Sequence, residues 1–509
     1  MKKCYPALAM CFFILCAVLC SCNTNVGNPS GSDVSFNPDG GFFGLELPDG
    51  IDYGGREVRV LTTAVNDDWS YQISPESNPS FSAEDAGTVV SAAAERTRLV
   101  EEKLGITITE QVIYSSSRYG GDMYQSIVNG SAAGTNDFLF CMPCTIEAAM
   151  LAGEGLLRDL NGIDTLDLSR EWWSRSFNDT VSIAGSVYFA VGDIGYVNKN
   201  ATLFIAFNKQ LEKDNHLAED YGYSSLYDMV DDMAWTQDVL FSMAKSVYQD
   251  LNENNACDVG DMLGLSGQDT SLRWLVMAGG ETIVAADSEG YPSLSIYNER
   301  AINLITDAQE YFQSGDSGFI SANDYFGVSN IPVTDVIVPE FKANKCMFFM
   351  DAVLNMSLLR DMETDFGVLP MPMYDKEQGK YISLIGAWSC DCVCVTIDVT
   401  GEDLELVGYL LDSLGAASRA LLNEAYYEQT LQYQISRDDD SMRMLDIIFA
   451  NRTPELAEIY RWGKMADVVA GMYKAPIGSF ASAYETAEQT TKKDIDETVE
   501  IFKNLQSKK

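Results

Sequence analysis

Apolar and polar residues alternate between strand-like and helix-like patterns along the first part of the chain body. Short apolar runs at 58–62, 106–112 and 138–140 predict strands, and helical spacing at 88–104, 122–128 and 146–151 predicts helices between them. Gly105 follows the first of these helices directly, in the position where glycine commonly ends a helix. Strands that alternate with helices indicate a parallel, doubly wound sheet, and the ligand crevice of such a sheet lies beyond the carboxyl ends of its strands.

The rest of the body combines further strands with a helical end. Apolar runs predict strands at 187–191 and 203–208, followed by helices through Val247. The segments 366–370 and 390–397 predict a return to the first sheet. From Leu404 onward the pattern is almost entirely that of amphipathic helix, including segments at 402–414, 440–450 and 492–505. We therefore expect an α/β fold with parallel sheets and a helical carboxyl-terminal third.

The first 21 residues have the pattern of an export signal. Lys2 and Lys3 precede an apolar run at 7–20 that is short for a membrane-spanning helix. The run ends in Leu19-Cys20-Ser21-Cys22, which resembles a bacterial lipobox with Cys22 as the acylated residue. Cys20 is the alternative acceptor, and a secretory signal without a lipid is the alternative to both. Residues 22–50 are rich in Asn, Gly, Ser, Pro and Asp, which predicts a flexible tether before a body that begins near Ile51.

Charge and histidine content exclude several classes of function. The 509 residues include 34 basic and 75 acidic side chains, for a formal charge of −41. Nucleic acid and anionic membrane surfaces are bound by clustered lysine and arginine, so both partners are unexpected, apart from a membrane reached through the lipid anchor. His216 is the only histidine, which rules out multi-histidine metal sites. The length allows two or three domains or one large bilobal body.

The cysteines of the body favour packing over chemistry. Cys141 and Cys144 have the spacing of a redox or zinc pair, but no second pair or nearby histidine completes a metal site. A local disulfide between them is the remaining alternative. Cys390, Cys392 and Cys394 alternate along an apolar segment, so we expect them to point to one face and pack as small apolar residues.

Several blocks in the body, taken in order behind the lipobox, carry a resemblance to a known family. They are 94–105, 151–160, 172–173, 187–193, 207–209, 235–236, 366–370 and 441–448. Together they resemble the extracellular solute-binding proteins of family 1, the carbohydrate-type lipoprotein receptors of bacterial ABC importers.

The resemblance implies a fold and a role. The fold would be two-lobed and periplasmic-binding-protein-like (type II), with hinge crossings and a cleft that closes over a solute. We expect lobe 1 to span 51–192 and 369–420, and lobe 2 to span 193–368 and 421–509. The protein would be a monomer on the extracytoplasmic face of the bacterial cell membrane, and it would deliver a mono- or oligosaccharide to the permease subunits of an ABC transporter.

Aromatic and acidic residues near the predicted cleft are candidates for contacting a sugar. Aromatic faces pack on the apolar side of a sugar ring, and planar polar groups bond its hydroxyls. The candidates are Asp193, Trp388, Trp274, Asp269, Asp351, Trp69 and Tyr188. A hinge or capping role is the alternative for Asp193, inter-lobe packing for Trp388, and a core position for Tyr188.

The loop at 250–261 has the spacing of a calcium-binding loop. Asp250, Asn252, Asn254, Asp258 and Asp261 supply oxygen side chains, and the carbonyl of Ala256 supplies another ligand. Two departures from the pattern are Asn255 in place of the turn glycine and Asp261 in place of a bidentate glutamate. We expect a structural calcium ion here, away from the sugar, and a solvated acidic loop is the alternative.

Two other classes of protein compete with a transport receptor. A secreted glycoside hydrolase needs only two suitably spaced carboxylates, and 75 acidic residues make such pairs uninformative. A surface adhesin or sensor on the same fold is the other alternative. No P-loop, GxGxxG, GxSxG or HExxH motif occurs, so we expect neither catalysis nor a cofactor for chemistry.

Overall fold

The first predicted strands form a parallel sheet of three. The computed structural model of the chain describes residues 41–325, 334–432 and 439–507. The strands have the order β2-β1-β3, with β1 (Arg56–Ala64) paired in parallel to both β2 (Ile106–Tyr114) and β3 (Phe140–Met142). The prediction of a parallel first sheet is therefore confirmed.

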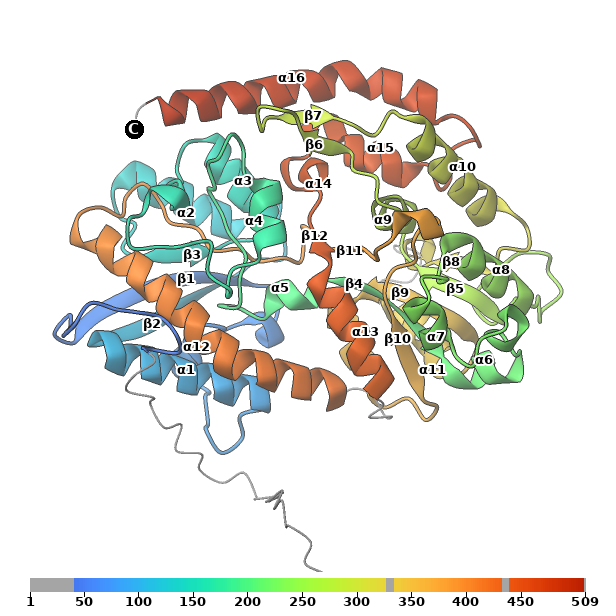
Figure 1. The fold of residues 1–509 in the computed structure, drawn as a ribbon, viewed down its shortest axis with the longest axis horizontal. Helices are drawn as coiled ribbons and strands as arrows, with labels where there is room; N and C mark the ends of the chain where they lie inside the picture. The colour runs from blue at the N-terminus through green and yellow to red at the C-terminus, as the bar shows by residue number, and fades with distance from the viewer. Residues whose placement is uncertain (1–40, 326–333, 433–438, 508–509) are drawn as a thin grey trace, which may run out of the picture. The chain divides into compact units, whose positions relative to one another are not determined.

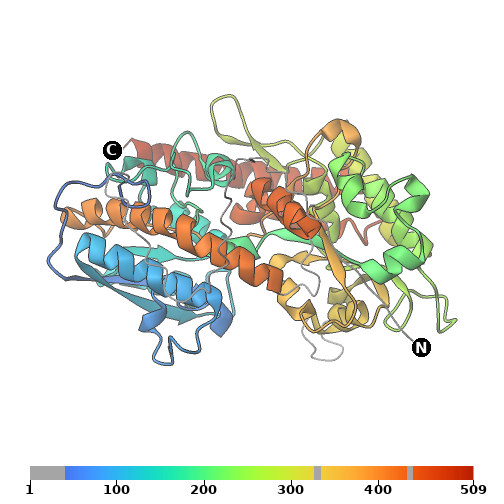
Figure 2. The same cartoon turned by 60° about the horizontal axis from the view of Figure 1, so that its bottom comes forward.

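Five helices accompany this sheet. They are α1 (Thr88–Leu104), α2 (Asp122–Ala133), α3 (Thr145–Gly153), α4 (Arg175–Val181) and α12 (Glu402–Gln432). Helix α1 has the predicted bounds and ends at Gly105, whose φ of 63° is the left-handed conformation that glycine adopts without steric cost. Helices α1 and α12 lie side by side, although their sequences are far apart (Figures 1 and 2).

The second sheet has five strands and mixed directions. Its order is β10 (Phe366–Leu369), β4 (Leu203–Asn208), β9 (Cys346–Ala352), β5 (Leu263–Gly267) and β8 (Phe319–Ser321). Strand β5 is parallel to β8 and β9, whereas β4 runs antiparallel to β9 and β10. Around it lie α6 (Lys209–Asp214), α7 (Leu226–Asp231), α8 (Gln237–Val247), α9 (Ser271–Ala278), α10 (Glu299–Gln313) and α11 (Thr334–Lys342).

Hydrogen bonds tie together the passages of chain that join the two sheets. The short helix α5 (Val197–Asn200) leads into β4, and the returning Gly386 donates its backbone N–H to the Ala201 carbonyl at 2.9 Å. A third passage contributes Arg452, which is buried and donates to the Asn198 side chain at 3.1 Å. Strands β11 (Ser383–Leu384) and β12 (Arg452–Thr453) pair in parallel beside them. The hinge crossings that were expected are thus present.

The carboxyl-terminal part is helical, as predicted. It contains α13 (Asp439–Ala450), α14 (Leu456–Tyr460), α15 (Met465–Gly471) and α16 (Phe480–Gln506). Helix α12 continues well beyond the predicted range 402–414, and α16 begins before the predicted range 492–505. Helix α16 runs past α15 and the two-stranded hairpin of β6 (Val284–Ala286) and β7 (Pro292–Leu294), and it reaches α3 (Figure 1).

Three predicted strands differ from the structure. Residues 187–191 and 390–397 form no continuous strand and make only isolated bridges, such as Ala190 with Val393 and Cys141 with Cys394. The segment 390–397 still lies beside β3, where it was expected. Strand β10, in contrast, pairs with β4 in the second sheet and does not return to the first. An apolar run predicts that a segment is buried. It does not predict which strand the segment pairs with, because the pairing strands come from distant parts of the chain.

The start of the folded body also differs from the prediction. Phe42 and Leu45 pair their backbones and are 2% and 4% exposed, packed into the hydrophobic cluster around the first sheet. Ordered structure therefore begins before Ile51, because these two apolar side chains find a core to enter. The signal segment and Cys22 lie outside the described residues, and the lobe boundaries stay a prediction. No helix within the described ranges is long and apolar enough to cross a membrane.

The cysteines pack in the interior. Cys390, Cys392 and Cys394 are at most 1% exposed, which confirms their predicted core role. Cys141 and Cys144 are both buried and free, so the structure contains no disulfide between them.

Glu455 gives the fold a predicted dependence on pH. Its buried carboxylate accepts the backbone N–H groups of Ile283, Val284 and Ala457 at 3.0–3.2 Å. Burial raises its pKa from 4.5 to about 7, so between these values the folded chain holds a proton that the unfolded chain has lost. The stability from this group is complete below pH 4.5 and is lost as the pH rises through 7.

We expect the Glu455→Gln variant, which mimics the protonated form, to show this directly. Between about pH 5 and pH 8, the free energy of unfolding of the wild type should fall by roughly 2–3 kcal/mol relative to that of the variant. Denaturant unfolding at the two pH values measures the difference. Parallel pH profiles for the two proteins would contradict the assignment.

Candidate functional site

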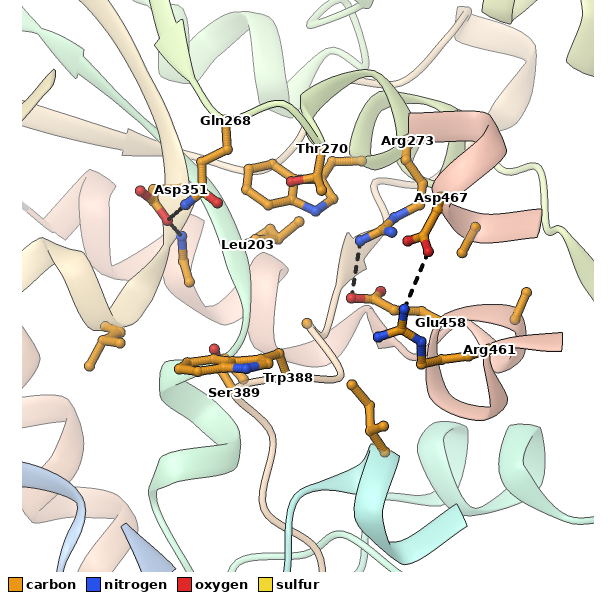
Figure 3. Close-up of a pocket in the computed structure, with 18 of the residues that line it drawn as sticks. Leu203, Gln268, Thr270, Arg273, Asp351, Trp388, Ser389, Glu458, Arg461 and Asp467 are labelled. Atoms are coloured by element: carbon orange, nitrogen blue, oxygen red, sulfur yellow. Dashed lines mark hydrogen bonds and ion pairs between the residues drawn. The ribbon is translucent and has the colours of Figure 1, made fainter. Parts of the chain in front are cut away.

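A cavity of about 360 Å³ receives side chains from both lobes. Its lining comes from Ala201 and Leu203 at the first crossing, the segment 268–274, the end of β9, the returning segment 386–389, and the segment 457–467. Figure 3 shows Trp388 at the bottom of this cavity, Asp351 and Gln268 on one side, and two arginine–carboxylate pairs on the other. Parts of the chain that are far apart in sequence thus converge on one space.

Two tryptophans provide its aromatic surface. Trp388 lies directly after the second crossing and is half-buried, and Trp274 lies on α9 and is 7% exposed. Behind Trp388 stands Trp69, with the two ring centroids 6.2 Å apart in an edge-to-face arrangement. Such packing fixes the orientation of an indole ring and leaves its other face free to receive a ligand.

Asp351 is the buried acid of the cavity. It is the last but one residue of strand β9, and its Oδ1 atom accepts the Gln268 side-chain amide at 3.1 Å and the Ala352 backbone N–H at 2.7 Å. Burial raises its pKa from 3.8 to about 6. Its Oδ2 atom is buried and has no hydrogen-bond partner among the described residues. A buried acceptor without a partner is costly, and a hydroxyl group of a ligand would satisfy it.

Other polar atoms of the lining are also buried without a hydrogen-bond partner among the described residues. They are Thr270 Oγ1, Arg273 Nε and Glu458 Oε2. Two arginines of the lining are paired with carboxylates, since Arg273 lies 3.1 Å from Glu458 and Arg461 lies 3.3 Å from Asp467. Lys464 and Asp351 are the other charged residues of the lining. The cavity therefore offers donors and acceptors to a polar ligand, while its carboxylates on this side are already neutralised.

A buried ion pair lies against Trp69 and Trp388. Arg118 and Asp391 are each 1% exposed and form a close salt bridge, and Gln72 donates to Asp391 at 3.1 Å. The guanidinium carbon of Arg118 lies 5.2 Å from the Trp69 ring centroid and 5.7 Å from that of Trp388. Burial raises the pKa of Asp391, and Arg118 offsets part of that effect. This pair supports the Trp388 ring, which we call the aromatic floor of the cavity.

The structure places three of the seven predicted ligand-binding residues in the lining of this cavity. Trp388, Trp274 and Asp351 line the cavity. Asp269 stands between the lining residues Gln268 and Thr270, but it is not itself part of the lining. Trp69 is 2% exposed and lies behind Trp388, so it supports the cavity wall and does not form its surface. A direct ligand contact by any of these residues stays a prediction.

Two predicted residues lie away from the cavity. Asp193 lies 3.1 Å from Lys199 and 3.6 Å from Arg419 at the first crossing, an arrangement that agrees with the alternative hinge role. Tyr188 is buried and stacks on Phe502 of α16, with ring centroids 4.8 Å apart. Both side chains already have partners in the structure, and a contact of either residue with a ligand stays a prediction.

The charged side of the cavity was not predicted from the sequence. Arg273, Glu458, Arg461 and Asp467 lie on or beside amphipathic helices, where charged residues are normally solvated. The backbones of Arg461 and Lys464 are unusual, since their φ values of 57° and 55° are left-handed and cost about 1–2 kcal/mol each for a residue with a side chain. No feature of the sequence marks that conformation.

The loop at 250–261 is held by its own polar groups. Asn255 has a φ of 60°, the left-handed conformation expected of it in the glycine position. Asp250 accepts the backbone N–H groups of Asn254 and Asn255, and the Asn254 amide donates to Asp258 at 2.7 Å. In the part of the chain that the structure describes, no group of three or more His, Cys, Asp or Glu side chains is arranged to hold a metal ion. Calcium binding therefore stays a prediction.

Known structures share this fold. A family 1 extracellular solute-binding protein from Bifidobacterium longum subsp. infantis matches with a TM-score of 0.53 at 13% identity, over 86% of this chain and 100% of that one. UspC from M. tuberculosis matches with a TM-score of 0.53 at 13% identity, over 85% of this chain and 100% of that one. An ABC substrate-binding protein from Listeria monocytogenes, in complex with cycloalternan, gives 0.50 at 13% identity, over 88% and 99%.

These matches show the class of fold. The chain has the two-lobed, periplasmic-binding-protein-like α/β fold that the sequence resemblance implied. No family model matches the sequence, and no curated protein sequence matches it.

The Arg118→Met variant tests the support beneath the aromatic floor. Removing the guanidinium leaves Asp391 as an uncompensated buried charge, so we expect the free energy of unfolding to fall by about 3–5 kcal/mol. A second change, Asp391→Asn, should restore part of this loss. Denaturant unfolding of the full chain measures both effects.

Arg98 offers a matched control on the surface. It pairs with Glu95 and Glu102, but its side chain is 47% exposed, so Arg98→Met should cost less than about 1 kcal/mol. Equal losses for the two arginine variants would show that the Arg118–Asp391 pair has no special structural role.

Proposed function

We propose that the protein is a lipid-anchored, extracytoplasmic solute-binding receptor of an ABC importer, acylated at Cys22. It binds a mono- or oligosaccharide, without catalysis, in the cavity lined by Trp274 and Trp388. The observation that carries this proposal is the combination of two indoles with buried polar atoms that have no partner among the described residues. A sugar presents both an apolar ring face and a set of hydroxyl groups, so it matches both features at once.

The chemistry of the cavity supports a neutral, hydroxyl-rich ligand. Asp351 Oδ2 and Glu458 Oε2 would accept hydroxyl protons, whereas Arg273 Nε would donate to a hydroxyl oxygen. The fold supports a receptor role, since the matching proteins include a family 1 extracellular solute-binding protein and an ABC substrate-binding protein in complex with cycloalternan. Closure of two lobes on such a ligand stabilises the closed form, because the ligand contacts both.

The carboxylates of the cavity favour binding over hydrolysis. A glycoside hydrolase needs two free carboxyl groups, one as acid and one as base or nucleophile. Here Glu458 and Asp467 are each paired with an arginine, which leaves Asp351 as the remaining acid of the lining. This arrangement supports a receptor that binds its ligand and releases it unchanged.

A thermal-shift screen of the protein with mono- and oligosaccharides tests the proposal, with peptides as the competing class of solute. A ligand at about 100 times its dissociation constant should add roughly 2.7 kcal/mol to the free energy of unfolding. Incubation with the same sugars should give no cleavage products. Stabilisation by peptides alone would refute the assignment of a sugar ligand, and turnover of a glycan would refute the receptor.

The Trp388→Ala variant removes the aromatic floor. We expect the dissociation constant for a stabilising sugar to rise about tenfold or more in titration calorimetry, because a central aromatic contact is lost. Trp388→Phe keeps a ring in place and should recover part of the affinity. Tyr221→Ala removes an aromatic ring that is 43% exposed and outside this cavity, so it should bind as the wild type does. Equal affinity in Trp388→Ala and Tyr221→Ala would exclude Trp388 from the site.

The loop at 250–261 binds a structural calcium ion in this proposal. Asp250, Asp258 and Asp261 supply carboxylate oxygens, and Asn252 and Asn254 supply amide oxygens. The left-handed Asn255 supports the assignment, because it allows the sharp turn that such a loop needs.

Calcium should therefore raise the melting temperature of the protein, and the Asp250→Ala variant should lose this response. Asp287→Ala is the matched control, since Asp287 also accepts backbone N–H groups in an exposed turn but lies outside the loop. Melting curves with and without calcium measure the effect, with magnesium as a second ion. A wild type that does not respond, or an Asp250→Ala variant that responds fully, would rule out calcium in this loop.

A further inference from the structure

A second cavity of about 850 Å³ adjoins the first. It lies between α3, the segment 459–462 and α16, which contribute among others Met150, Gly153, Trp462 and Thr498. The two cavities share four lining residues, namely Tyr119, Ile146, Arg461 and Asp467. They are therefore neighbours with a common wall.

The common wall consists largely of side chains. Arg461 ends α14 in the left-handed conformation, and its guanidinium carbon lies 4.4 Å from the centroid of the Tyr119 ring. The same guanidinium is 3.3 Å from Asp467. Tyr119 is 51% exposed, so its ring is open to a ligand despite this contact. Side chains can turn or bond to a ligand without a change in the backbone, so this wall permits passage from one cavity to the other.

The second cavity has the chemistry of the first. Met150 and Ile501 line this cavity and are 37% and 36% exposed, so they provide apolar faces for sugar rings. Asp494 and Glu497 add carboxylates to this lining. Asp494 accepts the Gly463 backbone N–H at 2.8 Å and Glu497 lies 3.2 Å from Lys493, but each carboxylate can accept further hydrogen bonds. With Asp467 included, three acids face the single arginine of this lining, so a neutral sugar fits and an anionic one is repelled.

We infer that the two cavities form one extended binding groove, and that the solute is a neutral oligosaccharide whose chain passes Tyr119 and Arg461 into the second cavity. This inference rests on the proposed function and adds the length of the ligand to it. Sugar units in the second cavity would contact Met150 and α16, and these contacts are out of reach of a sugar that only fills the first cavity.

The Gly153→Trp variant blocks the second cavity. Gly153 is the last residue of α3, its φ is not positive, and a Cβ atom built there meets nothing within 4 Å, so the new side chain enters open space. Gly471→Trp is the matched control, because Gly471 ends α15 with the same open surroundings but lines neither cavity. As a second pair, Met150→Ala removes a lining side chain, and Met442→Ala removes one that is 38% exposed elsewhere.

The probes are neutral gluco-, manno- and xylo-oligosaccharides of one to six units, in α- and β-linked series, titrated by calorimetry. In the series that binds, we expect the affinity of the wild type to rise about tenfold or more from the shortest binding sugar to the six-unit chain. Gly153→Trp should lose this gain and keep its affinity for the shortest binding sugar. Met150→Ala should bind the six-unit chain at least about threefold more weakly, and both controls should behave as the wild type.

Three results would overturn the inference. One is a wild-type affinity that does not depend on chain length. Another is a six-unit chain that Gly153→Trp and Met150→Ala both bind as the wild type does. In either case binding of short sugars would leave the proposed function intact. The third is that no sugar of any length binds, which would remove the proposed function and this inference together.

Discussion

The aromatic floor of the candidate site depends on one buried ion pair. Arg118 and Asp391 are 273 positions apart in sequence and almost completely excluded from solvent. Burying two charges costs more than a surface pair would, and the cost is tolerable only where geometry holds the partners together. Here the pair joins the segment after β2 to the returning segment beside β3, and it lies against both Trp69 and Trp388. The indole face that would receive a sugar is thereby fixed before any ligand arrives.

The cavity above this floor combines completed and incomplete polar interactions. The pairs Arg273–Glu458 and Arg461–Asp467 neutralise their own charges, and the remaining charged residues of the lining, Asp351 and Lys464, are of opposite sign. Individual atoms, such as Asp351 Oδ2, have no hydrogen-bond partner in the described part of the chain. A buried atom without a partner raises the free energy of the empty cavity, and a hydrogen bond to a ligand hydroxyl group would remove that cost. A ligand that lacks the hydroxyl group would leave the atom unpaired and bind more weakly. The second cavity adjoins the first and adds further apolar and polar side chains for the proposed ligand.

Local patterns in the sequence predicted much of the fold. Helix α1 has the predicted bounds because its helical spacing and the glycine that follows act within one segment. The prediction failed where a segment needed a distant partner: β10 joined β4, and residues 187–191 made only isolated bridges. Trp388, Trp274 and Asp351, which were predicted to contact a ligand, do line one cavity, although the contact itself stays a prediction. Asp193 was also predicted to contact a ligand, but its carboxylate forms ion pairs with Lys199 and Arg419.

The sequence by itself determined the α/β class, the helical end and the residues that enter the core, because burial leaves a periodic pattern of apolar side chains. It could not select, among 75 acidic and 34 basic residues, those that meet in pairs or face a cavity. Asp351 and Asp193 are the same residue type, yet one keeps a free buried oxygen and the other is neutralised. That difference arises from hydrogen bonds and ion pairs that act over a few ångströms between distant segments, and only the tertiary structure sets those distances.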